Sequence, residues 1–322
     1  MRVVLLGGTR FIGRAILEEL LAAGHEVLLV HRGEHEPQGL PQVPHLHAHR
    51  QKLPRERLRE FRPDAAVDVS AMTLADAQAV LEALPEGLRL VVCSSMDVYR
   101  AFLSVWRQIE TDPVPLTEES PVRDGPVPIP PAGLPGWDFD LKAYEKLDVE
   151  RLYLDRGGIV LRLPVVYGEH DYLRREELVL RRVRSGRKRM PAGAAKSLFT
   201  RGYVRDMGSG VRLALEADLR AEVLNLAESS TWSIGLWMRR IAVAAGAEME
   251  FVPVPDEKLP PDLAITGTLS QHLLVDSSKA RRLLGWRDTE PEKALLRSVR
   301  WHLEHPPEDA GDFSADDRAL SG

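Results

Sequence analysis

A glycine-rich segment near the start of the chain carries the clearest chemical signal. It reads Leu-Gly-Gly-Thr-Arg-Phe-Ile-Gly over residues 6–13, directly after a short apolar run, Arg2–Leu6. Glycines here let the backbone turn tightly and approach a pyrophosphate, while the free N–H groups that open a helix attract its charge. A tight turn without a ligand is the alternative. The segment predicts a dinucleotide site whose binding residues are Gly7, Thr9, Arg10, Phe11, Ile12 and Gly13.

The end of the next apolar run indicates which nicotinamide dinucleotide would fit. Glu26–Val30 continues into His-Arg-Gly at 31–33, and the first acid after it is Glu34. NAD usually needs an acid at this strand end for its ribose hydroxyls, whereas NADP needs positive charge for its 2′-phosphate. Arg10 and Arg32 could both supply that charge. The sequence therefore favours NADP, with NAD as the other choice.

The elements that must position these residues follow from the spacing of apolar side chains. Short apolar runs alternate with stretches that have one apolar stripe at helical spacing. This alternation predicts an α/β protein, a doubly wound parallel (Rossmann) sheet covered on both faces. Strands are predicted at Arg2–Leu6, Glu26–Val30, Val43–Ala48, Ala65–Val69, Leu88–Cys93, Ile159–Leu163 and Val223–Ala227. Helices are predicted at Phe11–Ala23, Arg55–Phe61, Leu74–Leu84, Asp138–Arg156, Glu176–Ser185 and Leu236–Ala245. Ser70 and Ala71, which follow a strand, join the predicted cofactor residues.

The chain divides into three predicted parts. Residues 1–168 are expected to form the dinucleotide-binding domain, residues 169–305 a smaller C-terminal α/β lobe that mainly binds substrate, and residues 306–322 a disordered acidic tail. Eight of the 23 prolines fall within residues 111–136. That concentration predicts a long irregular loop inside the first domain, of the kind that forms lids or binding loops.

Composition excludes several classes of protein. The 322 residues carry 43 basic and 48 acidic side chains, a net charge of −5, and 44% are hydrophobic. The single cysteine, Cys93, excludes an internal disulfide framework and a cysteine-based zinc site. No apolar stretch approaches the roughly 20 residues that span a bilayer. We expect a cytoplasmic protein with no membrane partner, and the negative charge argues against nucleic acid.

Taken in order along the chain, the motifs are similar to those of the extended short-chain dehydrogenase/reductase superfamily, in its NAD-dependent epimerase/dehydratase group. The resemblance covers about residues 1–304. With Arg10 in the glycine loop, the segment is similar to a branch that includes chloroplast stem-loop-binding proteins and atypical reductases. The other matching motifs are Val-Val-Cys-Ser-Ser-Met-Asp-Val-Tyr at 91–99, Leu-Arg-Leu-Pro-Val-Val-Tyr-Gly at 161–168, Tyr-Val-Arg-Asp at 203–206, Leu-Asn-Leu at 224–226 and Asp-Ser-Ser-Lys-Ala at 276–280.

The resemblance implies roles for individual residues. Ser95 matches the catalytic Ser/Thr, which hydrogen-bonds the substrate oxygen, and Lys146 matches the lysine that holds the nicotinamide ribose. Pro164 matches the segment along the nicotinamide ring, and Arg201 matches an arginine that binds a sugar-nucleotide diphosphate. The implied substrate is a small molecule of the sugar-nucleotide type, and a homodimer through the helix bearing Lys146 is also implied. Substrate contacts are expected from Ser95, Tyr99, Tyr167 and Arg201.

One expected catalytic residue is replaced. Relatives place a tyrosine four residues before the lysine, so that both lie on one helical face and the cation lowers the pKa of the phenol. Here the position holds Lys142. Lys142 could act in place of the tyrosine, or the 111–136 loop could let Tyr144 or a lid residue act. The site could also be degenerate, leaving a protein that senses cofactor or binds RNA.

Alternating histidines mark the third predicted strand. His45, His47 and His49 would lie on one face of a strand. No acid or cysteine near them in sequence completes a metal-binding set. We interpret them as a cluster at a solvent-exposed edge and expect no metal site.

A strongly basic segment spans residues 174–189. It contains eight arginine and lysine side chains against Glu176 and Glu177. A diphosphate contact and an RNA surface are both possible functions. The favoured interpretation is a solvated helix face that acids elsewhere in the chain neutralise.

Overall fold

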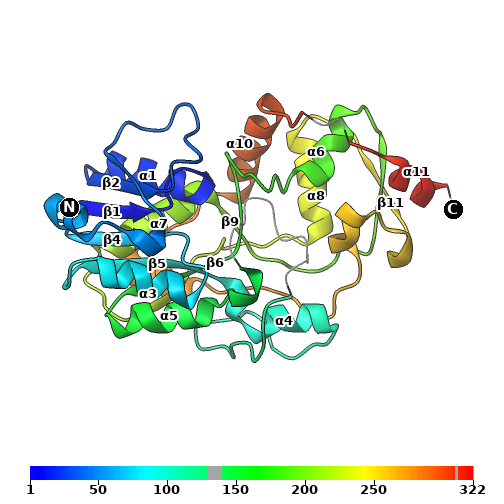
Figure 1. Cartoon of the computed structure of the whole chain (residues 1–322). Coiled ribbons are helices and arrows are strands. Elements are labelled where there is room, and N and C mark those ends of the chain that lie inside the picture. The colour runs from blue at the N-terminus through cyan, green and yellow to red at the C-terminus, as the bar shows by residue number, and fades with distance from the viewer. Residues whose placement is uncertain (129–139, 309–310, 322) are drawn as a thin grey trace.

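The computed structural model describes residues 1–128, 140–308 and 311–321, and its core is a seven-stranded sheet (Figure 1). Every neighbouring pair in the sheet is parallel. The order across the sheet is β10-β6-β5-β4-β1-β2-β3, so the direction of winding reverses beside β1, where such sheets bind ligands. This confirms the predicted fold class. The strands are β1 (Arg2–Leu6), β2 (Glu26–His31), β3 (His45–His47), β4 (Ala65–Asp68), β5 (Arg89–Ser95), β6 (Ile159–Leu163) and β10 (Val223–Asn225).

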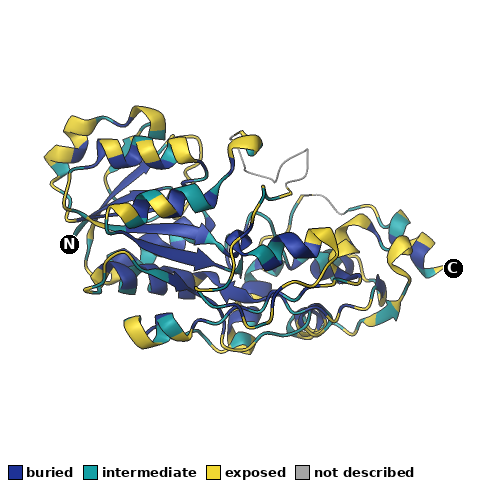
Figure 2. Ribbon diagram, turned by 90° about the horizontal axis from the view of Figure 1, so that it is seen from below, coloured by how far each residue is buried: buried dark blue, intermediate teal, exposed yellow. Residues whose placement is uncertain are grey.

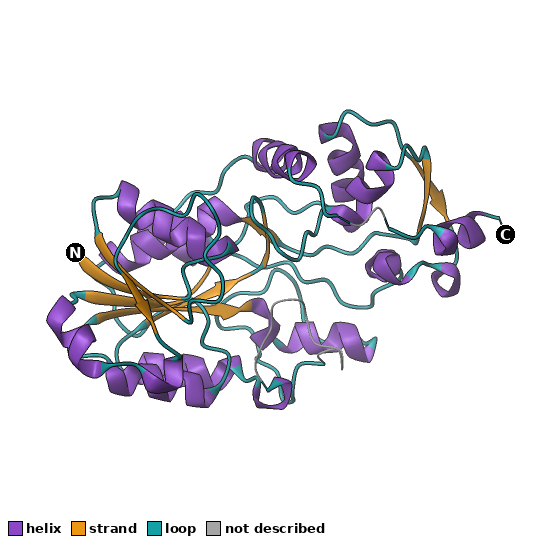
Figure 3. Cartoon of the chain, turned by 45° about the horizontal axis from the view of Figure 1, so that its top comes forward, coloured by secondary structure: helices purple, strands orange, loops and turns teal. Residues whose placement is uncertain are grey.

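Helices cover both faces of this sheet (Figure 3). Alternate residues of β1 point to opposite faces: Val3 and Leu5 pack in the core beneath α1 (Phe11–Ala22), and Val4 and Leu6 pack in the core beneath α2 and α3. Strands of this kind are buried on both sides, as Figure 2 shows by the dark sheet between helices with exposed outer faces. The second face carries α2 (Arg55–Phe61), α3 (Leu74–Ala83) and α5 (Lys146–Asp155).

Part of the helical layer that contains α1 comes from the second half of the chain. Helix α7 (Val204–Glu216) lies against α1 so closely that a Cβ at Gly208 would stand 2.8 Å from the carbonyl oxygen of Ala15. Strand β10 then extends the sheet beside β6. The sheet and its covering helices therefore continue past the predicted domain boundary at residue 168.

The second lobe extends to the far end of the molecule, where Figure 1 shows β11 (Glu250–Pro253), α6 (Glu177–Arg184) and α8 (Ile234–Ala244), whereas β9 (Arg201–Tyr203) lies near the middle, beside β6. Two parallel pairs join β7 (Val165–Tyr167) to β9, and β8 (Arg189–Ala192) to β11. None of the helices in the described residues is long and apolar enough to cross a membrane. The remaining helices are α4 (Arg100–Arg107), α9 (Ser278–Leu284), α10 (Pro291–Glu304) and α11 (Ser314–Leu320).

Two predicted elements differ in the structure. The helix predicted over Asp138–Arg156 begins only at Lys146, because the Glu145 backbone is extended and its N–H donates to the carbonyl oxygen of Met72 instead of continuing a helix. The disordered tail predicted over 306–322 is wrong for its described C-terminal part, where α11 places Asp316 in a buried ion pair with Arg182. Residues 129–139, which include part of the predicted proline-rich loop, lie outside the described residues.

The described part of that loop is tied to both lobes. The Arg123 N–H donates to the carbonyl oxygen of Val98, next to β5, and the Leu116 N–H donates to that of Leu274. Arg123 is also buried and forms an ion pair with Glu145, just before α5. The segment therefore braces the region between the sheet and the second lobe.

Candidate dinucleotide cleft and active site

The glycine loop has the geometry that its sequence predicts. Gly7 has a φ of +91°, a conformation that favours glycine, and its N–H donates to the carbonyl oxygen of Val30 over 3.0 Å. A Cβ at Gly13 would stand 2.0 Å from the carbonyl oxygen of Gly7. The loop thus folds back onto the start of α1, which leaves the first N–H groups of the helix free to face a ligand.

A cleft of about 560 Å³ opens beside this loop, at the carboxyl ends of β1, β2 and β4. It extends past Met72 and Thr73 to Asp140 and Ala143, close to Lys142. The predicted cofactor residues Ala71, Lys146 and Pro164 are not among those that line it. The predicted cofactor residues that do line it are Gly7, Thr9, Arg10, Phe11, Ile12, Gly13, Arg32 and Ser70.

The two arginines predicted to select NADP lie in the wall of this cleft, with different neighbours. The Arg10 guanidinium lies over the ring of Tyr172, 4.5 Å from its centre. Arg32 forms an ion pair with Glu34 over 2.9 Å and is exposed. Of these two cationic groups, Arg32 is already paired with an acid.

A third arginine in the cleft was missed by the sequence analysis. Arg50 donates to Ser70 Oγ over 2.7 Å and forms an ion pair with the buried carboxylate of Asp68. Burial disfavours the charged form, but the charge and hydrogen bond of Asp68, together with the charge of Asp76, outweigh it and raise the pKa of Arg50. Tyr153 also donates to Asp68, over 2.8 Å. The sequence did offer a clue, since Arg50 lies two residues after the predicted strand Val43–Ala48.

Ser95, Asp97 and Tyr144 form a connected group at the end of β5. The Asp97 N–H donates to Ser95 Oγ over 3.2 Å, and the Tyr144 hydroxyl donates to Asp97 Oδ2 over 2.6 Å. Asp97 Oδ1 is buried and has no hydrogen-bond partner in the described residues. Burial raises the pKa of Asp97, and burial beside Asp97 raises the pKa of Tyr144 well above its usual value. The Tyr144 phenol is therefore held in its protonated form.

The two lysines lie in different surroundings. Lys146 is buried, its Nζ donates to the carbonyl oxygens of Ala71 and Cys93 over 2.7 and 3.0 Å, and burial lowers its pKa. Lys142 is exposed in the 3₁₀ turn Leu141–Ala143. Because α5 begins at Lys146, the expectation that residues 142 and 146 share one helical face is wrong.

Tyr99 and Tyr167, the predicted wall residues, are buried with their hydroxyls already bonded. Tyr99 donates to Asn225 Oδ1 and Tyr167 donates to Glu228 Oε1, each over 2.7 Å. Burial raises the pKa of both phenols. Both rings pack beneath the site, and neither hydroxyl is exposed to a substrate.

A second hollow of about 470 Å³ lies in the second lobe and contains Arg201. The Arg201 guanidinium is buried 4.2 Å from the centre of the Trp237 ring and donates to the carbonyl oxygen of Trp232 over 3.2 Å. Burial lowers its pKa to about 10. No carboxylate of the described residues forms an ion pair with it, so this cation is available to an anionic ligand. Val165, Leu178, Phe199, Ile234 and Ile265 form the apolar part of the hollow.

The basic segment 174–189 is neutralised by acids of the same lobe. Every arginine in it forms an ion pair, and Arg182 is fully buried between Asp262 and Asp316. The neutralisation by acids agrees with the favoured interpretation, but the solvated face does not hold at Arg182, which is buried. The remaining pairs are Arg174 and Arg184 with Glu177, Arg175 with Asp171, Arg181 with Asp262, Arg187 with Asp317, and Arg189 with Glu250.

Parallel winding, the order of the strands and a glycine loop at the reversal point define this chain as a doubly wound Rossmann fold, which it shares with solved sugar-nucleotide epimerases and dehydratases. Solved structures agree. The chain is 17% identical to UDP-glucose 4-epimerase of Thermotoga maritima, with a TM-score of 0.70 over 95% of this chain and 99% of that one. It is 16% identical to dTDP-glucose 4,6-dehydratase of Bacillus anthracis, solved with NAD, with a TM-score of 0.70 over 94% and 97%.

Two curated proteins are similar in sequence along almost the whole chain. One is chloroplast stem-loop binding protein of 41 kDa b of Arabidopsis thaliana, 24% identical over 99% of this chain and 84% of that protein. The other is 3-diazoavenalumate denitrifying reductase of a Streptomyces species, 26% identical over 90% and 97%. No family model matches the chain.

Proposed function

We propose that this protein is an NAD(P)-dependent oxidoreductase of the sugar-nucleotide epimerase, dehydratase or reductase type. The observation that carries the proposal is the cleft at the reversal point of the sheet, with the glycine loop at one end and residues 140–143 at the other. A bound nicotinamide dinucleotide would supply hydride transfer at a hydroxyl-bearing carbon. The protein would orient the two reactants and move the proton.

The hollow in the second lobe fits the phosphates of such a substrate. Arg201 presents a buried cation without an ion-pair partner in the described chain, and the hollow around it is lined by apolar side chains, three further arginines and the acids Glu177 and Asp262. A buried guanidinium binds phosphate in a fixed, two-pronged geometry, and a low-dielectric wall strengthens that attraction. The named epimerase relative was solved with UDP-glucose. We therefore assign the substrate class as nucleotide-linked sugars, with the diphosphate at Arg201.

Lys142 is the proposed proton-transfer residue, with Ser95 hydrogen-bonding the reacting oxygen. Lys142 is exposed beside Asp140 and Ala143, which line the cleft, so its flexible side chain can reach a ligand there. The Tyr144 phenol is less suitable, because its hydroxyl already donates a hydrogen bond to Asp97 and its pKa is raised. Lys146 would act from behind the cleft by fixing the strand ends around it.

The test compares Lys142→Ala with Lys258→Ala. Lys258 is also exposed in a 3₁₀ turn, Asp256–Lys258, but is far from the cleft residues in sequence and is not among them. Loss of a proton-transfer residue should lower kcat about 10²- to 10⁴-fold and leave dinucleotide affinity unchanged. Lys258→Ala should behave as the parent. If Lys142→Ala retains full turnover and Tyr144→Phe loses it, Tyr144 has the role instead.

A catalytically inactive dinucleotide-binding protein is the second candidate function. It is favoured by the Tyr144–Asp97 hydrogen bond, which holds the tyrosine nearest to Lys146 in a protonated, buried state. This candidate predicts tight binding of a dinucleotide and no change in its absorbance with any nucleotide-linked sugar. Ser95→Ala would then leave the dinucleotide affinity unchanged.

RNA binding is the weaker form of that second candidate. One relative is named for binding a stem-loop, but the arginines of segment 174–189 are paired with acids in this chain. A protein that binds RNA through this segment should lose affinity steeply with salt. We expect no such salt-dependent complex.

A further inference from the structure

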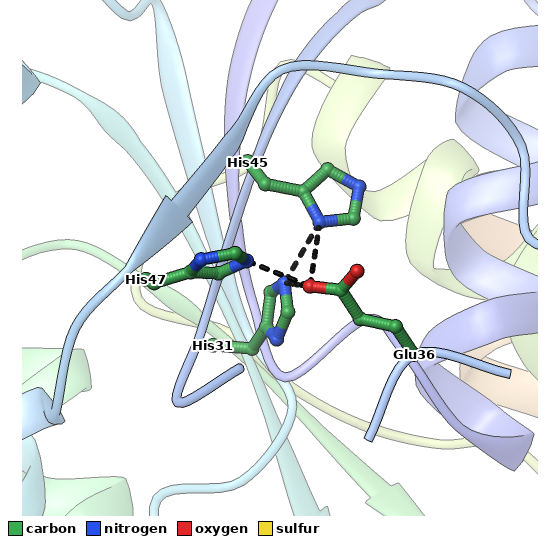
Figure 4. A group of neighbouring side chains, drawn as sticks. All are labelled: His31, Glu36, His45 and His47. Carbon is green, nitrogen blue, oxygen red and sulfur yellow. Dashed lines mark hydrogen bonds and ion pairs between the residues drawn. The ribbon is translucent and has the colours of Figure 1, made fainter. Parts of the chain in front are cut away.

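Four side chains at the outer edge of the sheet converge on one point (Figure 4). His31 ends β2, His45 and His47 lie on β3, and Glu36 comes from the connection between the two strands. Three imidazole nitrogens and one carboxylate oxygen face one another there. We propose that this group, the His31–Glu36 cluster with His45 and His47, is a binding site for a divalent transition metal, with Zn²⁺ as the best fit.

The distances match the size of a tetrahedral site. His31 Nε2 stands 2.9 Å from His45 Nδ1, and His47 Nε2 stands 2.7 Å from Glu36 Oε1. Glu36 Oε1 is 3.5 Å from both His31 Nε2 and His45 Nδ1, and all four ligand atoms lie within 4.8 Å of one another. Zinc bonds of about 2.0–2.1 Å place neighbouring tetrahedral ligands roughly 3.3 Å apart. These four separations lie within about 0.6 Å of that spacing, and the remaining pairs, at up to 4.8 Å, would close by at most about 1.5 Å through side-chain rotation.

The pairing of the strands explains why the histidines meet. In the parallel register His31 lies opposite His47, and His45 lies opposite Leu29, so His45 and His47 share the face on which His31 lies. Gly33, with a φ of +85°, turns the chain after β2 and would place a Cβ only 3.4 Å from the His47 ring. The connection that follows brings Glu36 back over the three rings.

The hydrogen bonds of His31 set which of its ring nitrogens carries the proton. An imidazole binds a metal through a ring nitrogen that is not protonated. His31 Nδ1 accepts a hydrogen bond from the Gly33 N–H, so a neutral His31 ring carries its proton on Nε2. Binding of a metal at Nε2 would move that proton to Nδ1, so the Gly33 N–H would lose its acceptor and the contact would have to shift.

The donor set and its exposure point to zinc rather than to a hard cation. Three imidazoles and one carboxylate are typical of zinc, copper and nickel sites, whereas Mg²⁺ and Ca²⁺ prefer oxygen ligands. His31 is almost covered, but the side chains of His47 and Glu36 are 55% and 43% exposed. An ion can therefore enter from solvent without opening the sheet.

The group differs from the one that the histidine spacing suggested. His49 is not part of it and instead accepts a hydrogen bond from the Gln51 N–H through its ring. The missing acid is Glu36, nine residues before His45, and the third imidazole comes from the neighbouring strand. The sequence alone predicted histidines at a strand edge and no metal site. That expectation overlooked Glu36 and His31, because only folding brings them next to His45 and His47.

The experiment uses the full chain without an affinity tag, stripped with chelator and titrated with ZnCl₂ by calorimetry. We expect one Zn²⁺ per chain by elemental analysis. His47→Ala and Glu36→Gln remove exposed ligands, and each should weaken the Kd at least about 10- to 100-fold. His35→Ala is the matched control, since this exposed histidine lies in the same connection but outside the cluster, and its Kd should be unchanged.

Cobalt provides a second readout. Co²⁺ should bind with the strong visible bands of four-coordinate geometry, and those bands should disappear in His47→Ala. Circular dichroism of each variant confirms that the fold is retained. Absence of stoichiometric Zn²⁺ binding, or equal affinity in the parent, His47→Ala and Glu36→Gln, would overturn the proposal.

Discussion

The glycine loop that opens the dinucleotide cleft and the basic segment 174–189 are both short stretches of unusual composition. Only the glycine loop has, in the folded chain, the property that its composition suggests. Gly7 and Gly13 act through the shape of a few neighbouring residues, and that shape forms locally. The positive charge of the basic segment depends on its partners, and acids from distant parts of the chain cancel it. A motif that acts through backbone geometry is thus more readily inferred from sequence than one that acts through charge.

Arg201 sharpens the comparison, because it lies outside the basic segment and remains without an ion-pair carboxylate in the described residues. Its guanidinium instead rests on Trp237 inside an apolar hollow. The arginines of segment 174–189 form ion pairs within the lobe, whereas Arg201 has no ion pair in the described residues and is available to a ligand.

Removal of Arg182 should give the largest effect. Arg182 and Asp316 are both fully buried, so Arg182→Met would leave an uncompensated buried carboxylate. We expect a loss of about 3–5 kcal/mol in the free energy of unfolding. Arg189→Met is the control, because its pair with Glu250 is exposed and should contribute at most about 1 kcal/mol. Urea unfolding monitored by fluorescence measures both. Equal losses in the two variants would show that the basic segment is a solvated face and not a structural one.

Gly13→Ala should give the next largest effect, on dinucleotide binding. The added Cβ would meet the carbonyl oxygen of Gly7, which must move, and the loop would lose its fit to a pyrophosphate. We expect affinity to fall by about 100-fold, equivalent to about 2.7 kcal/mol. Gly125→Ala serves as control, since a Cβ there finds only ordinary contacts. Calorimetry with NADPH gives the affinities. Unchanged binding in Gly13→Ala would place the ligand elsewhere.

Glu228→Gln tests, through pH, the buried carboxyl that accepts the Tyr167 hydrogen bond. Burial raises the pKa of Glu228 from its ordinary 4.5 to about 7. Between these values the folded chain retains a proton that the unfolded chain has lost, so the free energy of unfolding falls as pH rises. Glutamine cannot ionise, so the variant should gain about 1–3 kcal/mol on the parent between pH 4.5 and 7. Denaturant titrations at several pH values measure the difference. Parallel pH profiles for the two proteins would contradict the assignment.

Arg32→Ala should give the smallest effect. Arg32 is exposed and paired with Glu34, so its contribution to a 2′-phosphate is partly cancelled. We expect NADPH affinity to fall about 5- to 10-fold, or roughly 1 kcal/mol, with NADH affinity unchanged. Fluorescence titrations with both coenzymes give the ratio. An equal fall for NADH would mean that Arg32 does not read the 2′-phosphate.

The parts of the fold and site that sequence predicted share a local cause. Strand and helix periodicity located most of the sheet, and the glycine loop located its ligand cleft. The turn before α5 was missed because Glu145 bonds to Met72, which is remote in sequence. Without that turn, neither the exposure of Lys142 nor the approach of Tyr144 to Asp97 could be foreseen. The meeting of His31 with Glu36 was missed for the same reason.

The positions of α7, which packs against α1, and of β10, which extends the sheet, also determine how the protein can be divided. Both elements lie beyond residue 168, yet β10 pairs with β6 and α7 rests against α1. A fragment cut at that point would expose an apolar sheet edge and one flank of α1 to water. Such a half-protein would be prone to self-association, and the two lobes are better regarded as one cooperative folding unit than as exchangeable modules.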